Sequence, residues 1–115
     1  MNTLKLYSPA KINLTLEILN KRQDNFHNII SLVTDISLKD EIVFSNSKSV
    51  TFDSNFSLDQ KSNSILNTIS LIKKKFKLDN GIDVKLIKNI PLASGLGGGS
   101  SNAATTLIAL NDIWQ

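Results

Sequence analysis

Residues 10–18 alternate between apolar and polar side chains. Even-numbered positions are apolar and odd-numbered positions are polar: Ile12, Leu14, Leu16 and Ile18 against Lys11, Asn13, Thr15 and Glu17. Successive side chains of a strand point to opposite faces, so this period of two predicts a half-buried strand. Lys11 and Asn13 are then expected side by side on its polar face.

The segments that follow also favour strands. Asn20–Asn25 is polar and predicts a turn, and the β-branched residues of His27–Ser37 predict a second strand. Two further strands, Glu41–Ser45 and Ser49–Asp53, are separated by Asn46-Ser47, which predicts a β-hairpin.

The second half of the chain predicts two helices with a strand between them. After a polar loop over residues 54–63, Asn63 or Ser64 is expected to cap a helix. Its apolar residues are spaced four, three and four apart: Ile65, Ile69, Ile72 and Phe76. Asp79-Asn80-Gly81 is expected to end this helix, and a strand follows with alternating Ile82, Val84 and Leu86.

The last predicted helix begins near Ser100 and runs to the C-terminus. Its apolar positions recur at helical spacing: Ala103, Ala104, Leu107, Ile108 and Trp114. Leu110 and Trp114 are expected in the core or at a domain interface. The order of elements indicates the α+β class. Because no glycine stops this helix and no later element covers it, we expect the chain to be the front part of a longer one.

Composition excludes several classes of protein. The 115 residues make one domain at most. The absence of cysteine excludes a disulfide scaffold and a cysteine-ligated metal, and a single histidine excludes a multi-histidine metal centre. No apolar run has the length of a membrane span and the chain does not begin with a signal peptide, so we expect no membrane partner and a cytoplasmic location.

Charge does not point to a nucleic-acid partner. The net charge of +3 includes a cluster formed by Lys73-Lys74-Lys75 and Lys77 at the end of the first predicted helix. Cations are favoured there by the helix dipole. A nucleic-acid surface interleaves arginines and aromatic residues with its lysines, whereas this chain has one arginine, Arg22, and the cluster contains only Phe76. We therefore expect no nucleic acid.

The segment from Pro91 to Ala103 holds four of the five glycines and joins the last predicted strand to the last helix. Glycines let the backbone approach a ligand closely, and N–H groups at a helix start favour anions, so a phosphate-binding loop is predicted. Gly99 is followed by Ser100-Ser101 rather than Lys-Ser, which excludes a Walker A loop, and the dinucleotide and protein-kinase motifs are also unmatched. A Gly/Ser linker is the alternative, but a linker does not usually lead straight into a helix.

Two segments together resemble one family. Ser8-Pro9-Ala10-Lys11-Ile12-Asn13-Leu14 continuing to Asp24-Asn25-Phe26-His27, and Pro91 through Ala104, resemble the N-terminal part of the 4-diphosphocytidyl-2-C-methyl-D-erythritol kinases of the GHMP superfamily. The resemblance implies a mixed or antiparallel sheet with helices on one face, a fold also seen in a ribosomal protein. Residues 1–115 would form an incomplete ATP-binding domain that lacks the C-terminal domain.

The same resemblance implies an activity and a set of site residues. The activity is ATP- and Mg²⁺-dependent phosphorylation of the 2-hydroxyl of the cytidine-diphosphate-linked methylerythritol. Lys11 would be catalytic at the reacting hydroxyl, and the substrate would contact Asn13, Phe26 and His27. Ser101, with Ser100, would lie near Mg²⁺ through the phosphates. The ATP-binding residues would be Pro91, Leu92, Ala93, Ser94, Gly95, Leu96, Gly97, Gly98, Gly99, Ser100 and Ser101.

The chain departs from the family pattern in three ways. Asn25 replaces a glycine before the aromatic-histidine pair, although asparagine tolerates the left-handed conformation better than most residues. Ala93 and Ser94 stand where the family often has glycines. The family's catalytic aspartate lies in a Gly-Ala-Asp-Val-Pro type motif beyond the last helix, and no aspartate here (Asp35, Asp40 and Asp112 among them) has that context.

Other functions stay open at this point. One is a sister GHMP kinase acting on homoserine, mevalonate or a sugar. The other is a non-catalytic module that binds a nucleotide or RNA. The sequence leaves the oligomeric state open.

Overall fold

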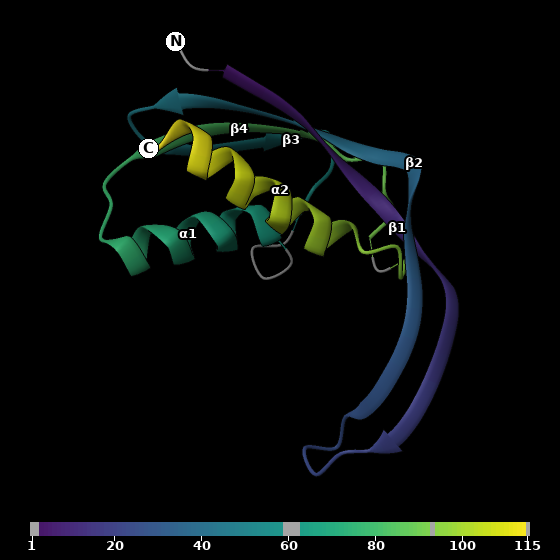
Figure 1. The fold of residues 1–115 in the computed structure, drawn as a ribbon. Helices are drawn as coiled ribbons and strands as arrows, with labels where there is room; N and C mark the ends of the chain where they lie inside the picture. Colours follow the sequence, from purple (N-terminus) through teal and green to yellow (C-terminus); the bar gives the residue numbers. More distant parts are fainter. Residues whose placement is uncertain (1–2, 59–62, 93, 115) are drawn as a thin grey trace.

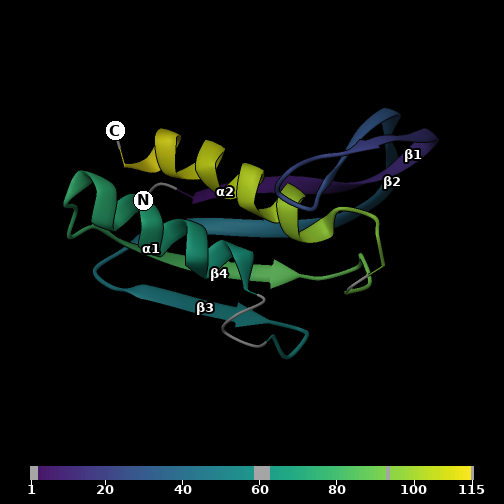
Figure 2. The ribbon, with the colours of Figure 1, turned by 90° about the horizontal axis from the view of Figure 1, so that it is seen from below.

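The computed structural model describes residues 3–58, 63–92 and 94–114. Its elements, in chain order, are β1 (Thr3–Lys21), β2 (His27–Ser47), β3 (Val50–Ser54), α1 (Ser64–Phe76), β4 (Gly81–Ile87) and α2 (Gly98–Ile113) (Figure 1). The strands form one four-stranded sheet in the order β1-β2-β4-β3. Both helices lie on the same face of this sheet (Figure 2). The α+β class predicted from the sequence is confirmed.

The predicted hairpin between β2 and β3 is wrong, because β4 lies between these two strands. β4 pairs with β2 in antiparallel and with β3 in parallel orientation. Val84 sits opposite both Phe44 of β2 and Phe52 of β3. The three apolar residues of β4 that face the helices are almost completely buried, namely Ile82, Val84 and Leu86. Only the central position buries them against both neighbours, and that burial outweighs the local preference for a short hairpin turn.

The core lies between the sheet and the two helices. It consists of Ile42, Phe44, Ile65, Ile69, Ile82, Val84, Leu86, Ala109 and Leu110. In α1 the predicted stripe holds for its first half, and Ile72 packs against the core from its edge. Phe76, at the end of the stripe, is 58% exposed, because it lies in the last turn of the helix.

The first helix ends earlier than predicted. Asn63 caps its start, and its side-chain oxygen accepts a hydrogen bond from the N–H of Leu66 at 3.1 Å. At the other end, Lys77 takes the left-handed conformation with φ of 53° and its N–H donates to the Lys73 carbonyl, which closes the helix. Gly81 is instead the first residue of β4. A side chain there would collide with the backbone of Ser47 and Ser49, so this position requires glycine for close packing.

The buried stripe of α2 also differs from the prediction. Leu107 and Ile108 are exposed, whereas Asn102, Thr105, Thr106, Ala109 and Leu110 are buried. The helix is rotated about its axis relative to the prediction, because Asn102 makes polar contacts beneath the helix, which are described below. At the end of the helix, the indole N–H of Trp114 donates to the Gly81 carbonyl at 3.1 Å, and Trp114 packs against the core.

The outer half of the β1–β2 pair, residues 12–35, projects from the body of the protein as a curved two-stranded arm (Figure 1). Residues 22–26 form its turn, so the predicted turn at Asn20–Asn25 is confirmed with bounds shifted toward the C-terminus, and Asn25 adopts the left-handed conformation with φ of 70°. The predicted half-burial of the first strand is wrong here. No third strand or helix covers either face of the arm in the described structure, so its apolar side chains are exposed: Leu14, Leu16, Ile18, Leu19, Ile29, Ile30, Leu32 and Val33.

A β-bulge in the arm changes which residues of β1 share a face. Asn13 lies opposite Val33, but Thr15 lies opposite Leu32, so Leu14 is an extra residue. The predicted grouping of Lys11 and Asn13 with Thr15 and Glu17 therefore does not hold. Beyond the bulge, Leu16 lies opposite Ser31 and Ile18 opposite Ile29. Since alternate residues of β2 share a face, Lys11 and Asn13 share theirs with Leu16, Ile18 and their β2 partners Ile29, Ser31, Val33 and Asp35.

Candidate active site

The glycine-rich segment forms a loop that ends at the first residue of α2. Gly95 and Gly97 both have left-handed backbone conformations, with φ of 78° and 72°. Gly97 caps α2, and no side chain that the structure describes caps this helix end. A pocket of about 370 Å³ lies against the helix start and is lined by Lys88, Pro91, Leu92, Ser94, Gly95, Gly97, Gly98, Gly99 and Ser100. Backbone N–H groups at a helix start favour an anion, so this pocket suits a phosphate.

Lys11 of β1 lies directly on this loop. Its backbone N–H donates to the Leu96 carbonyl at 2.8 Å, and its ammonium donates to the Gly95 carbonyl at 3.2 Å. The aliphatic part of Lys11 crosses Gly97 so closely that a Cβ at Gly97 would lie 2.8 Å from its Cγ and Cε. The two segments singled out in the sequence, more than 80 residues apart, therefore meet in the structure.

Asn13 extends this contact along β1. Its side-chain oxygen accepts a hydrogen bond from the Lys11 ammonium at 3.0 Å. Two of the three N–H groups of the ammonium thus have acceptors, and the third has none among the described residues.

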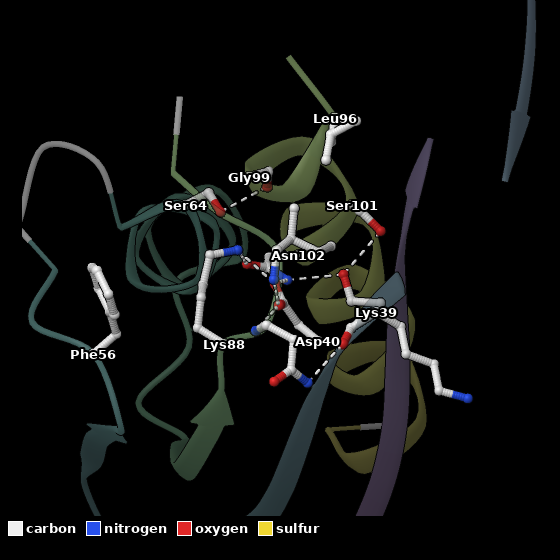
Figure 3. A network of polar contacts seen from close by, with 12 residues as sticks. Lys39, Asp40, Phe56, Ser64, Lys88, Leu96, Gly99, Ser101 and Asn102 are labelled. Atoms are coloured by element: carbon white, nitrogen blue, oxygen red, sulfur yellow. Dashed lines mark hydrogen bonds and ion pairs between the residues drawn. The ribbon is translucent and has the colours of Figure 1, made fainter. Parts of the chain in front are cut away.

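A buried polar network supports the loop from below (Figure 3). The Asp40 side chain is fully buried and forms an ion pair with Lys88, whose side chain is 5% exposed. Its carboxylate also accepts from the backbone N–H groups of Asn89 and Ile90 at 2.6 and 2.8 Å, and from the Asn102 amide at 3.0 Å. One carboxylate therefore joins β2, the segment that precedes the glycine loop, and the first turn of α2.

The network continues to β1. The Asn102 amide also donates to the Ser8 hydroxyl at 2.8 Å, and the Ser8 hydroxyl donates to that of Ser101 at 2.9 Å. On the other side, the Ser64 hydroxyl at the start of α1 donates to the Gly99 carbonyl at 2.7 Å. The first turn of α2 is thus tied to β1, β2 and α1.

The environment of Asp40 changes its pKa. Burial favours the neutral carboxyl and would raise the pKa, but the hydrogen bonds from Lys88, Ile90, Asn89 and Asn102 favour the carboxylate more strongly. The pKa of Asp40 is therefore lowered from its ordinary value of 3.8. The carboxylate is ionised at neutral pH and its partners already satisfy it, so it serves the structure of the loop.

Sequence reasoning missed this network. Asp40 lies in the charged run Lys39-Asp40-Glu41, where nothing local separates the buried carboxylate from its exposed neighbours. The alternation of β2 gives a partial signal, because Ile42 and Phe44 are core residues and Asp40 occupies the same face two residues earlier.

The predicted ATP-binding residues differ in their surroundings. Ala93 lies outside the described residues. The carbonyl of Leu96 accepts from Lys11, and the hydroxyl of Ser101 accepts from Ser8, so these two face β1 rather than the pocket. The other predicted residues line the pocket: Pro91, Leu92, Ser94, Gly95, Gly97, Gly98, Gly99 and Ser100.

Phe26 and His27 are not brought to the loop. Both are exposed near the tip of the arm, where His27 lies opposite Lys21, ten residues along β1 from Lys11. That separation corresponds to roughly 33 Å of strand length. The structure thus brings Lys11 and Asn13 together with the loop, and leaves Phe26 and His27 at the far end of the arm.

The residues present do not make a magnesium site by themselves. Magnesium is usually held by one or two carboxylates together with substrate phosphates. The residues that line the pocket include no carboxylate, and both oxygens of Asp40 are engaged beneath the loop. Among the described residues, no group of three or more acidic or histidine side chains is placed to hold a metal ion.

Across the part of the chain that the structure describes, no helix has the length and apolar character of a membrane span.

Comparisons with known proteins agree with this fold. Residues 63–115 match the family model described as "GHMP kinases N terminal domain". A crystal structure of 4-(cytidine 5'-diphospho)-2C-methyl-D-erythritol kinase aligns with 96% of this chain, with a TM-score of 0.85 and 32% identity, and the chain covers 41% of it. Homoserine kinase from Cytophaga hutchinsonii aligns with a TM-score of 0.67 at 18% identity, which shows a shared fold. The chain therefore has the fold of a GHMP kinase N-terminal domain.

Within that class, the sequence is similar to one kind of kinase. The 4-diphosphocytidyl-2-C-methyl-D-erythritol kinase of Francisella tularensis subsp. novicida is 48% identical over 114 residues, which are 96% of this chain and 42% of that protein. The protein of the same name from Caldanaerobacter subterraneus subsp. tengcongensis is 42% identical over 97% of the chain. The resemblance stated from the two motifs is confirmed. The chain spans about two-fifths of the length of these relatives.

Proposed function

We propose that this chain is the N-terminal, ATP-binding part of a kinase. The kinase would transfer the γ-phosphoryl group of ATP to the 2-hydroxyl of 4-diphosphocytidyl-2-C-methyl-D-erythritol, in the methylerythritol phosphate route to isoprenoids. The contact between Lys11 and the glycine loop supports this most strongly, because it sets a cation beside a helix start that favours anions. The names of the relatives narrow the acceptor alcohol. A cytoplasmic location, where ATP is available, belongs to the same proposal.

In this proposal the loop binds and Lys11 stabilises charge. The β- and γ-phosphates lie against the first turn of α2, and the free N–H of the Lys11 ammonium points to the transferring group. Phosphoryl transfer develops charge on the equatorial oxygens, and a fixed cation stabilises it without reorganisation. Mg²⁺, held mainly by the phosphates, would neutralise part of their charge when bound.

The acceptor alcohol is proposed to bind along the face of the arm that carries Lys11 and Asn13. Asn13 contacts the substrate beside the reacting hydroxyl. Phe26 and His27 contribute at the cytidine end, which requires the arm tip and the loop to reach the same molecule. The general base is proposed to come from residues outside this chain, because Asp40 is buried and fully engaged.

The test is an assay of phosphoryl transfer from ATP by the full-length protein, monitored by phosphorus NMR. The cytidine-linked alcohol, homoserine and mevalonate are offered as acceptors in parallel reactions. We expect product from the cytidine-linked alcohol alone. Lys11→Ala should lower kcat by about 10²- to 10³-fold, as for loss of one transition-state contact, and Lys85→Ala on the exposed side of β4 should change it little. Transfer to a different alcohol, or equal rates in the two variants, would contradict the proposal.

A further inference from the structure

A chain of side-chain hydrogen bonds leads from the Lys11 ammonium across the arm to β2. The ammonium donates to Asn13 Oδ1 at 3.0 Å, and Asn13 Nδ2 donates to Ser31 Oγ at 2.9 Å. The Ser31 hydroxyl in turn donates to the backbone carbonyl of Thr15 at 2.7 Å. Ser31 is therefore the link between the Lys11–Asn13 pair and the backbone of the arm.

The direction of every bond in this chain is determined. An ammonium can only donate, so Asn13 must turn its oxygen toward Lys11 and its amide nitrogen toward Ser31. The Ser31 hydroxyl has one proton, which the Thr15 carbonyl accepts, and its lone pairs stay available to Asn13. The reverse orientation of the Asn13 amide would set its N–H groups against the ammonium.

The β-bulge supplies the acceptor at the end of the chain. The extra residue, Leu14, interrupts the regular ladder between β1 and β2. At the bulge, hydrogen bonds between side chains and the backbone replace the regular backbone bonds between the two strands. The Thr15 carbonyl accepts from Ser31, and Thr15 Oγ1 accepts from the N–H of Leu32 at 3.2 Å. Bulges next to active sites re-aim side chains, and this one places Asn13 and Ser31 within reach of each other.

We propose that Ser31 is a positioning residue for the phosphoryl transfer: it fixes the Asn13 amide, whose oxygen holds the Lys11 ammonium in place for the acceptor alcohol. The inference rests on the proposed function and adds to it a residue that does not line the loop pocket and bonds to Asn13 and Thr15 rather than to Lys11. Its effect falls on the alcohol side of the reaction, because the contacts of Lys11 with the Gly95 and Leu96 carbonyls do not involve Ser31.

The experiment compares three variants of the full-length protein. Ser31→Ala removes the hydroxyl, Ser31→Thr keeps it, and Ser37→Ala makes the same chemical change on the same strand. Ser37 is exposed, and its hydroxyl has no hydrogen-bond partner among the residues that the structure describes, which makes it a matched control. We expect Ser31→Ala to lower kcat/KM for the alcohol by about 10- to 100-fold, the cost of a misplaced reacting group. KM for ATP should stay within about twofold, and Ser31→Thr should recover most of the loss.

A second readout is independent of activity. In the ¹⁵N spectrum of the resting protein, Ser31→Ala should shift the Asn13 side-chain amide resonances, and Ser37→Ala should leave them in place. Equal kinetics for Ser31→Ala and Ser37→Ala, or equal losses for ATP and alcohol, would overturn the role of Ser31 while the kinase function stands. If the wild-type protein phosphorylates no alcohol, the kinase function fails, and unshifted Asn13 resonances would then refute the Ser31 linkage as well.

Discussion

At the scale of single residues, the site depends on the fit between Gly97 and Lys11. Gly97 combines two requirements, a left-handed backbone and open space above its Cα for the Lys11 side chain. Gly95 meets the first requirement alone, because a Cβ there would have no atom within 4 Å. A substitution at Gly95 therefore introduces backbone strain alone, whereas a substitution at Gly97 introduces the same strain and also displaces the Lys11 side chain.

Alanine substitutions at these glycines should show that difference. Each change forces a left-handed alanine and should cost roughly 1–3 kcal/mol in the free energy of unfolding. Gly97→Ala also pushes Lys11 from its place, so we expect its kcat to fall at least about tenfold below that of Gly95→Ala. Urea unfolding and steady-state kinetics measure the two effects, and equal kcat values would show that the close approach of Lys11 is unimportant.

Asp40 is the second residue on which the site depends, because all its partners are donors. Asp40→Asn places a donor among these donors and leaves the Lys88 ammonium buried without a counter-charge. Removing one partner of a buried ion pair costs about 3–5 kcal/mol. In the double variant Asp40→Asn/Lys88→Met the buried charge is also gone, so it should be more stable than Asp40→Asn alone. A double variant that is less stable than the single one would contradict this account.

The lowered pKa of Asp40 also predicts a pH dependence. A carboxyl whose pKa is lower in the folded than in the unfolded state stabilises the fold above its unfolded pKa, near 3.8. This contribution is lost as the pH falls through the lowered pKa of the folded state. The difference in unfolding free energy between wild type and Asp40→Asn should therefore be constant near neutral pH and shrink below about pH 4. Denaturant unfolding at a series of pH values measures it, and a difference independent of pH would exclude an ionised Asp40.

At the scale of elements, the arm contrasts with the rest of the sheet. Residues 12–35 form two strands without a covering layer, and two-stranded ribbons are marginally stable in water. β4 has strands on both sides and helices above it. The arm is therefore the element that opens most easily.

Hydrogen exchange on the 115-residue chain measures this difference. We expect backbone amides at residues 15–19 and 28–32 to exchange at least about 100-fold faster than those of Ile82–Leu86, because local opening there requires little loss of buried surface. Amides at residues 42–45, on the covered part of β2, serve as the control and should exchange slowly. Equal protection along the whole of β2 would show that the arm is as stable as the body.

The elements also show what could be predicted from the sequence. β4 and α1 were predictable because Ile82, Val84 and Leu86, and Ile65 and Ile69, follow the periods of their elements and face the core. The strand order was not, because the pairing of β4 with β2 is a long-range contact that no local pattern encodes. In α2 the spacing of apolar residues predicted the wrong buried face. Asn102 is buried because its amide bonds to Asp40, and this orientation of the helix leaves Leu107 and Ile108 exposed.

The candidate site was predictable in part for the same reason. Lys11, Asn13 and the glycine loop are contiguous in two short motifs, and the structure brings them together. The supporting residues Ser31, Asp40 and Lys88 are scattered along the chain, and their roles come from tertiary contacts alone.

At the scale of the whole molecule, the site lies where three parts meet. The start of the arm, the loop before α2 and the first turn of α2 converge at one end of the sheet (Figures 1 and 2). The projecting arm gives the chain a radius of gyration of 16.0 Å, compared with about 13 Å for a compact domain of this length. Lys11, at the start of the arm, contacts the Gly95 and Leu96 carbonyls of the loop beside the pocket, so the arm and the pocket meet at this residue.

The most direct test of this account is where ATP binds. Backbone amide spectra of the isotope-labelled full-length protein, recorded during titration with Mg²⁺ and ATP, report each position separately. We expect the amides of Gly95 and Gly97–Gly99 to shift together with that of Lys11, and Gly97→Ala to weaken the response. Unchanged glycine amides, with shifts confined to the lysine cluster at Lys73–Lys75, would show that the loop is not the phosphate site.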